Sequence, residues 1–175
     1  MALGRRRALL IGAVGAAAAA AGVLAGLTLL RSEDGSAALQ AAEFTDLEGR
    51  ARRLAEWKGK VVLCNFWATW CPPCREEIPM LVTLAREMGA KGIEVVGIAL
   101  DSAAKVGEFA KDYSVSYPLL IAGPNGIDLM RAAGNPVGGL PYTVFLDRQG
   151  RIVYRKLGAL KQAEVRERIL KMLRA

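Results

Sequence analysis

Residues 61–78, VVLCNFWATWCPPCREEI, decide the fold of this chain. The first seven residues form a nearly continuous apolar run, which is typical of a buried strand in a parallel sheet. Pro72 then opens a segment that predicts a helix, because proline is well tolerated in the first helical turn. Cys71 and Cys74 are therefore expected at a strand-to-helix junction.

A pair of thiols at such a junction has a defined chemistry. Unpaired N–H groups and the helix dipole favour negative charge at a helix N-terminus, so the thiol of Cys71 should lose its proton readily. The thiolate is the species that attacks disulfides. Cys74 comes one turn later and is placed to resolve the mixed disulfide. We therefore expect a redox-active disulfide between Cys71 and Cys74, with Cys71 as the attacking thiol.

Metal binding is the main alternative for such a pair. Structural zinc takes four ligands, and this chain has no His and only one other cysteine, Cys64, so a four-ligand Cys/His site within one chain is excluded. Cys64 lies inside the predicted strand, where a free cysteine usually serves as a small buried hydrophobic group. A purely structural disulfide would close too short a loop to stabilise much. Two thiolates are soft ligands that suit Cu(I), so a copper-binding module stays open as an alternative. The interpretation of Cys71 and Cys74 as a redox-active pair requires no metal and no cofactor.

The motif also carries a family resemblance. Residues 65–77 resemble the active-site segment of membrane-anchored, extracytoplasmic thioredoxin-like proteins of the TlpA/ResA type, which include cytochrome c maturation thioredoxins. The resemblance runs from about Phe44 to the C-terminus. Four further features support it: an N-terminal hairpin and lead-in at residues 44–59, Pro79 inside the active-site helix, the loop at residues 139–143 with Pro141, and a terminal hairpin at residues 144–153.

The resemblance implies an α/β thioredoxin fold, in which helices flank a central mixed sheet. It adds an N-terminal hairpin and an inserted strand-helix element within residues 101–133. The hydrophobic pattern by itself predicts alternating strands and helices. Strands are expected at residues 61–67, 93–100, 117–121, 142–147 and 151–157, and helices at residues 72–88, 104–113, 127–133 and 162–173.

Glu77 is the third residue expected to take part in catalysis. It follows Cys74 by three residues, so the two share one face of the helix. The resemblance places this glutamate beneath the dithiol, where burial would raise its pKa and let it exchange a proton with Cys74. The alternative is an ordinary exposed glutamate, a description that fits Glu76 better. Asn65 stands where ordinary thioredoxins carry a buried aspartate and has no proton to give, which strengthens the case for Glu77.

The resemblance also suggests which residues face the substrate. Pro141 is expected to form a cis peptide bond and to face the dithiol, so it is grouped with the catalytic residues. The backbone of Leu140 would then pair with an extended client peptide by strand addition. Trp70, Pro72 and Pro73 flank the cysteines and complete the expected substrate-facing surface.

The N-terminus predicts a membrane anchor. Residues 5–7 are arginines, and residues 8–30 carry no charge and are long enough to cross a bilayer of about 30 Å. Arginines before the span and acids after it put the N-terminus in the cytoplasm. We expect a cytoplasmic stub and anchor at residues 1–30, a linker at residues 31–42 and a thioredoxin-like domain at residues 43–175. A cleaved signal sequence stays open as the alternative, as does export by the Sec or the twin-arginine route.

The charge of the chain and its predicted location limit the partners that it can have. The net charge is +7, and outside the N-terminal arginines the basic residues are dispersed, which with no recognisable module argues against nucleic-acid binding. The predicted location is the bacterial cell membrane, as a single-pass protein with its catalytic domain on the periplasmic side. The family implies reduction of client disulfides, such as those of apocytochrome c or of copper-site assembly factors. It also implies a membrane electron donor of the DsbD/CcdA type. A disulfide oxidase or isomerase is the enzymatic alternative.

Overall fold

The computed structural model describes residues 35–174 and residue 22. The rest of the predicted anchor at residues 1–30 lies outside the described residues, as do residues 31–34 of the predicted linker. Within the part of the chain that is described, no helix is both long and apolar enough to cross a membrane.

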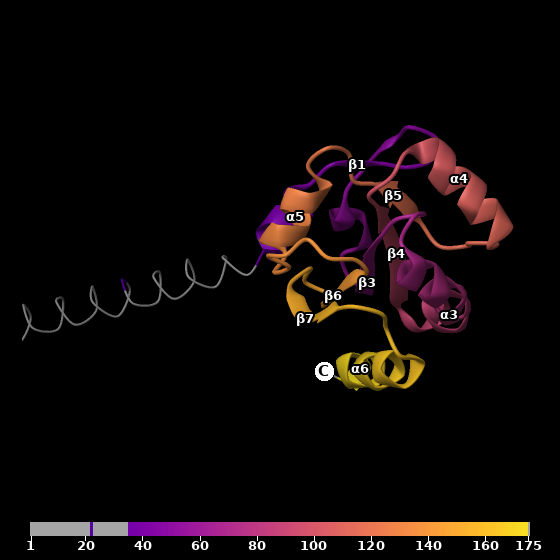
Figure 1. The fold of residues 1–175 in the computed structure, drawn as a ribbon. Helices are drawn as coiled ribbons and strands as arrows, with labels where there is room; N and C mark the ends of the chain where they lie inside the picture. Colours follow the sequence, from indigo (N-terminus) through magenta and orange to yellow (C-terminus); the bar gives the residue numbers. More distant parts are fainter. Residues whose placement is uncertain (1–21, 23–34, 175) are drawn as a thin grey trace, which may run out of the picture. The chain divides into compact units, whose positions relative to one another are not determined.

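The expected mixed sheet flanked by helices is confirmed (Figure 1). The strands are β1 (Phe44–Thr45), β2 (Ala51–Arg52), β3 (Val61–Trp67), β4 (Ile93–Ala99), β5 (Leu119–Ile121), β6 (Tyr142–Leu146) and β7 (Ile152–Leu157). The helices are α2 (Ser36–Ala41), α3 (Pro72–Met88), α4 (Ala103–Asp112), α5 (Gly126–Ala132) and α6 (Gln162–Arg174), with short 3₁₀ turns η2 (Leu54–Trp57) and η3 (Gly89–Lys91).

The strand order places β3 near the middle of the sheet. The order is β2-β1-β5-β4-β3-β6-β7; β3, β4 and β5 run parallel, and β6 pairs antiparallel with β3. All seven residues of β3 are buried, as its continuous apolar run predicts. The active-site loop therefore leaves the sheet from a fully buried, doubly paired strand.

Each face of the sheet has its own apolar core. Helices α3, α4 and α6 cover one face and bury Ile78, Val106 and Ile169 against Leu63 and other residues of β3 and β4. On the other face, α2, η2 and α5 bury a second cluster that includes Leu39, Trp57, Cys64 and Met130. Because neighbouring strand residues point to opposite faces, Cys64 lies away from α3 and Asn65 lies toward it.

The linker prediction for residues 31–42 is wrong for its second half. Residues 36–41 form α2, and Leu39 is fully buried. The backbone N–H of Ile152 donates to Ser36 Oγ at 2.8 Å, and Gln40 Nε2 donates to the carbonyl of Gly150 at 3.3 Å. A run of small residues reads as a tether in the sequence, but alanine is also the best helix former and lets a helix pack closely. The folded domain therefore begins at about Gly35 rather than at residue 43.

The N-terminal hairpin and the inserted element have the expected form. Phe44 pairs with Arg52 across the β1–β2 hairpin, and α4 with β5 forms the insertion between β4 and α5. Strand β5 starts at Leu119 rather than at Tyr117, and Pro118, which has no N–H, immediately precedes it.

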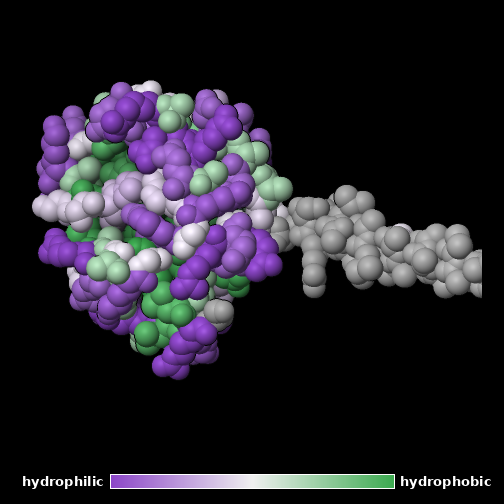
Figure 2. Space-filling model, turned by 180° about the vertical axis from the view of Figure 1, so that it is seen from behind, coloured by the Kyte–Doolittle hydropathy of each residue, from purple (hydrophilic) through white to green (hydrophobic). Residues whose placement is uncertain are grey.

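The closely spaced basic residues at positions 50–53 form ion pairs with neighbouring carboxylates. Arg50 contacts Asp46 at 2.7 Å and Glu48 at 2.8 Å, and Arg53 contacts Glu43 at 2.9 Å. Hydrophilic residues also cover most of the face that Figure 2 shows. These arginines thus belong to a solvated and internally neutralised surface.

Candidate active site

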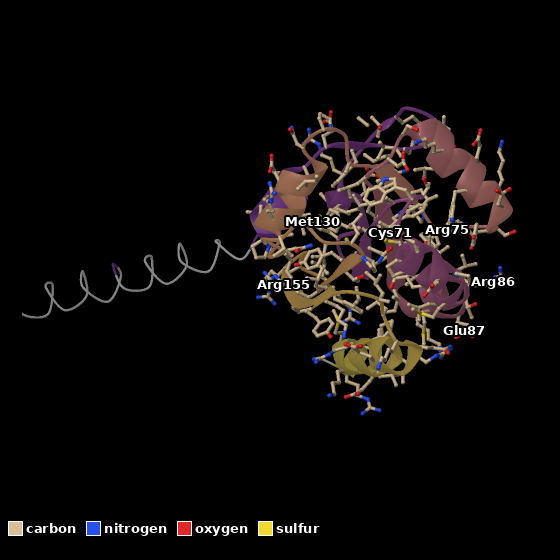
Figure 3. The ribbon with its side chains drawn as sticks, viewed as in Figure 1. Cys71, Arg75, Arg86, Glu87, Met130 and Arg155 are labelled. Carbon is tan, nitrogen blue, oxygen red and sulfur yellow. A yellow bond between two sulfur atoms is a disulfide. The ribbon has the colours of Figure 1, made fainter. Side chains whose placement is uncertain are left out.

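Cys71 and Cys74 form a disulfide at the start of α3 (Figure 3). Their Cα atoms are 5.3 Å apart, and Cys71 is the N-cap residue of the helix. Cys71 keeps 4 % of its surface exposed, whereas Cys74 has none. Pro72 and Pro73 supply no N–H groups to the first turn. The cysteine that keeps some exposed surface is thus the one at the helix N-terminus.

The loop that holds Pro141 meets the same end of the sheet. Tyr142 pairs with Phe66, so Pro141 lies beyond the last paired residue, at the carboxyl end of β3 where the active-site loop begins. The Leu140–Pro141 peptide bond is cis, as expected. Leu140 is half-buried and packs against the core cluster that contains both cysteines.

Glu77 is buried, with 4 % of its surface exposed, whereas Glu76 is exposed. One carboxylate oxygen, Oε1, accepts from Asn65 Nδ2 at 2.7 Å, and the other, Oε2, accepts from the backbone N–H of Leu160 at 2.7 Å. Burial raises the pKa of the Glu77 carboxyl, and the two hydrogen bonds oppose this rise without cancelling it. The predicted burial and raised pKa of Glu77 are therefore present.

The partners of Glu77 come from distant parts of the chain. Asn65 lies opposite Thr143 in the β3–β6 pair, and Asn65 Nδ2 also donates to Thr143 Oγ1 at 3.0 Å. Both side chains are fully buried. Leu160 comes from the connection between β7 and α6. Sequence reasoning identified Asn65 but missed Thr143 and Leu160, because neither lies in the motif nor at a helical spacing from it.

Tyr117 is a second titratable group on this side of the sheet that sequence reasoning missed. It precedes β5, and its buried hydroxyl has no hydrogen-bond partner among the described residues. Burial raises the pKa of Tyr117, and the negative charge of Glu77 adds to the rise. Tyr117 is therefore close enough to Glu77 for the two to interact electrostatically.

A side-chain hydrogen bond ties the active-site loop to the β4–α4 turn. The hydroxyl of Thr69 donates to Asp101 Oδ2, and the other carboxylate oxygen accepts from the backbone N–H of Ser102 at 2.8 Å. Burial favours the neutral acid, but these donors and Lys105 outweigh it and lower the pKa of Asp101. This hydrogen bond attaches Thr69, which lies two residues before Cys71, to the β4–α4 turn.

The remaining candidate residues differ in how far their side chains are exposed to solvent. Trp70 is 64 % exposed, and Pro72 and Pro73 are also at the surface, so all three are open to a client protein. Cys64 is fully buried in the core of the opposite face, and burial raises the pKa of its thiol. In the described part of the chain, no three His, Cys, Asp or Glu side chains gather in a way that would hold a metal ion.

Sequence comparisons agree with this geometry. A family model described as Redoxin matches residues 33–171. A thiol-disulfide oxidoreductase ResA of Bacillus thuringiensis subsp. konkukian is 32 % identical over 129 residues, which cover 73 % of this chain and 72 % of the relative. The thioredoxin-like protein YneN of Bacillus subtilis is 37 % identical over 136 residues, covering 74 % of this chain and 76 % of that protein.

Solved structures agree with the fold. A thiol:disulfide interchange protein of the thioredoxin family from Chlorobium tepidum superposes with a TM-score of 0.67 at 28 % identity, covering 75 % of this chain and 94 % of its own. A secreted thiol-disulfide isomerase from Corynebacterium glutamicum superposes with a TM-score of 0.69 at 27 % identity, covering 76 % of this chain and 83 % of its own.

Proposed function

This chain belongs to the redoxin family and, within it, to the ResA-like thiol–disulfide oxidoreductases, and we propose that it reduces disulfides of exported client proteins. The observation that carries the proposal is the Cys71–Cys74 pair at the N-terminus of α3, with a buried carboxyl three residues further along the same helix.

The reaction proceeds by two exchanges. The Cys71 thiolate attacks one sulfur of the client disulfide, whose S–S bond breaks as a mixed disulfide forms, and the released client sulfur leaves as a thiolate that takes up a proton. The Cys74 thiolate then attacks Cys71 Sγ and releases the second client sulfur. Two electrons pass to the client, and the Cys71–Cys74 disulfide remains.

Glu77 supplies the proton acceptor for the second exchange. The thiol of Cys74 is fully buried and must lose its proton before it attacks, and water has little access to it. Glu77 shares its helix face and carries a carboxyl whose pKa is raised by burial, which suits it to general-base catalysis. Asn65, the polar partner of Glu77 on β3, does not titrate.

The same carboxyl favours the reducing direction. A strong oxidant such as DsbA owes its potential of about −120 mV to a stabilised reduced form, whereas thioredoxin lies at about −270 mV. A negative charge on Glu77 opposes a thiolate nearby, so it withholds that stabilisation from reduced Cys71 and Cys74. We therefore expect a potential on the thioredoxin side, below about −200 mV.

Location and partners complete the proposal. The catalytic domain is tethered to the bacterial cell membrane by residues 1–30 and works on the periplasmic side. It receives electrons from a membrane donor of the DsbD/CcdA type and passes them to apocytochrome c or to a copper-site assembly factor. The arginines at residues 5–7 and the uncharged run at residues 8–30 support the tether. The structurally similar isomerase of Corynebacterium glutamicum is a secreted protein, which agrees with an exported domain.

A redox titration of the full-length chain tests the function. The protein is equilibrated in dithiothreitol buffers and then offered an oxidised Cys-x-x-Cys-His peptide, the haem-attachment sequence of c-type cytochromes. We expect a potential below about −200 mV and reduction of the peptide. A potential near −120 mV, with oxidation of the reduced peptide, would identify a disulfide oxidase instead. Tight Cu(I) binding without disulfide reduction would favour the copper-binding module.

Protease accessibility tests the topology. Protease added to intact spheroplasts should digest the domain that carries Cys71, because the predicted topology places it outside the cytoplasmic membrane. A cytoplasmic marker protein should survive in the same sample. Full protection of the domain while the membrane is intact would contradict the proposed location.

A further inference from the structure

Asn135 is a buried polar residue in the connection between α5 and β6, which also carries Leu140 and Pro141. Only 2 % of its surface is exposed. Its backbone N–H donates to the carbonyl of Met130 at 3.1 Å, which attaches it to α5 (Figure 3). Its side-chain Nδ2 donates to the carbonyl of Gly139 at 2.8 Å. Asn135 therefore connects the end of a helix to the loop that holds the cis-proline.

The carbonyl of Gly139 determines which way this amide points. A carbonyl oxygen only accepts, so the amide must present Nδ2 rather than Oδ1 to it. Asn135 Oδ1 is buried and has no hydrogen-bond partner among the described residues. Within that part of the chain, the contact with Gly139 is thus the one hydrogen bond of the Asn135 side chain. The backbone carbonyl of Asn135 holds the same loop, because it accepts from the N–H of Gly138 at 3.1 Å.

The hydrogen bond from Asn135 also fixes the direction of the next N–H group. The peptide bond between Gly139 and Leu140 is trans, so its C=O and N–H point in opposite directions within one plane. Because the C=O points at buried Asn135, the N–H of Leu140 points away from Asn135. Glycine at position 139 would otherwise leave this plane free to turn.

The backbone of Leu140 is the part of the loop that is left for a partner. Among the described residues, neither its N–H nor its C=O has a hydrogen-bond partner. The neighbouring carbonyls are already in use, since that of Gly139 accepts from Asn135 and that of Pro141 accepts from the N–H of Gly158 at 2.9 Å. The loop thus offers one residue for pairing with an extended chain.

We propose that Asn135 is a positioning residue for client binding, which holds the Gly139–Leu140 peptide plane so that the N–H of Leu140 faces the client. A carbonyl of an extended client chain then accepts from this N–H, by strand addition. Without the Asn135 amide the plane turns, a carbonyl takes the place of the N–H, and this pairing is lost. The inference rests on the reduction of polypeptide disulfides in the proposed function, and it gives Asn135 no step in the thiol exchange itself.

Two disulfide substrates distinguish the positioning of a client from general damage to the site. The oxidised Cys-x-x-Cys-His peptide has a backbone to pair with Leu140, whereas bis(2-hydroxyethyl) disulfide has none. Single turnovers of the reduced full-length chain, held in detergent, give a second-order rate constant for each. In Asn135→Ala the ratio of the peptide rate constant to that of the small disulfide should fall about three- to tenfold, which corresponds to one net hydrogen bond. An unchanged ratio would overturn the proposal.

Asn135→Asp adds a pH-dependent readout at nearly constant side-chain volume. An ionised carboxylate repels the carbonyl of Gly139, so at neutral pH the ratio should fall at least as far as in Asn135→Ala. The protonated acid donates to that carbonyl again, so the ratio should recover as pH falls in Asn135→Asp but not in Asn135→Ala. The pH dependence of the thiols affects both substrates and cancels in the ratio. Failure of the ratio to recover would contradict the role of a donor at this position.

Asn125→Ala is the matched control for both variants. Asn125 is exposed at the N-cap of α5, and its side chain makes no capping hydrogen bond. Its ratio of rate constants should equal that of wild type. An equal fall in Asn125→Ala would show that the ratio does not report on the Gly139–Leu140 plane, and would overturn the proposal.

Hydrogen exchange in the wild-type chain keeps the inference testable where the variants fail to fold. In the oxidised full-length protein, one side-chain N–H of Asn135 and the N–H of Gly138 should be protected, whereas the N–H of Leu140 should exchange freely. Adding the unreactive Ser-x-x-Ser-His analogue of the peptide at saturation should protect the N–H of Leu140. Free exchange at the Asn135 side chain, or an unprotected Leu140 in the complex, would overturn the proposal.

These outcomes separate the inference from the function on which it rests. If the wild-type chain does not reduce the peptide, the proposed function fails. If the wild-type chain reduces the peptide and the ratio is unchanged in Asn135→Ala, the function stands and only the role of Asn135 fails.

Discussion

Replacing Glu77 by glutamine should change how the stability of the oxidised protein depends on pH. Glu77 is buried, and burial raises the pKa of its carboxyl above that of the unfolded chain. Between those two values the folded protein holds a proton that the unfolded chain has lost. Stability from this group is therefore complete below the unfolded value and is lost as pH rises through the folded value. Glutamine resembles the neutral acid and carries no such dependence.

The magnitude follows from linkage to a single proton. An unfolded glutamate titrates at about 4.3, and a difference of one proton changes the free energy of unfolding by about 1.4 kcal/mol per pH unit. The free energy of Glu77→Gln minus that of wild type should rise with up to this slope above pH ~4.3 and level off above the folded pKa. Other carboxyls contribute in the opposite sense, because the pKa values of Asp46, Asp101 and Asp147 are lowered. They are present in both proteins and cancel in the difference.

Urea denaturation of both proteins from about pH 4 to pH 7.5 measures this difference. The Cys71–Cys74 disulfide is kept intact, so the thiols of the active site do not titrate. Glu76→Gln is the matched control, since Glu76 is exposed and its difference from wild type should stay flat. A flat difference for Glu77→Gln would refute a raised pKa at this site. A difference that falls with rising pH would show that the pKa of Glu77 is lowered rather than raised.

Four further variants test the roles of individual residues. Cys71→Ala should abolish disulfide reduction, whereas Cys74→Ala should leave Cys71 joined to the client in a mixed disulfide; alkylation and non-reducing gels distinguish the two, and a mixed disulfide in Cys71→Ala would reverse the assignment. Trp70→Ala should change the free energy of unfolding by less than about 0.5 kcal/mol, because the side chain is 64 % exposed, but raise KM for a protein client. Leu39→Ala should lower the free energy of unfolding by about 2–5 kcal/mol, and a loss as small as that of the exposed Leu170→Ala would place α2 outside the folded domain.

The parts of the structure that follow from local pattern could be predicted from the sequence. The continuous apolar run of β3, the proline start of α3 and the spacing of Cys71, Cys74 and Glu77 are each fixed within a few residues of chain. The spacing predicts only that Cys74 and Glu77 share one helix face, and the expected burial of Glu77 came from the family resemblance.

Contacts between residues that are far apart in the sequence could not be predicted in this way. The N–H donor for Glu77 comes from Leu160, 83 residues away, and the hydroxyl beside Asn65 comes from Thr143, 78 residues away. Neither residue type signals such a role, because one contact is made by backbone and the other by a common strand residue. Helix α2 was not predicted for another reason. Only Leu39 in it is buried, and one apolar residue among small ones gives no periodic hydrophobic pattern.

Asparagine at position 65 determines how many protons the site holds. An aspartate there would put two carboxyls at the 2.7 Å separation that now joins Asn65 Nδ2 to Glu77 Oε1. Two such groups cannot both ionise, so they would share a proton and titrate as a coupled pair. With asparagine, Glu77 is the one carboxyl in this hydrogen-bonded group, and its charge changes in a single step. In the proposed reaction, the proton that buried Cys74 must lose then has one carboxylate acceptor, Glu77, whose hydrogen-bond partners on β3 and in the β7–α6 connection carry no charge.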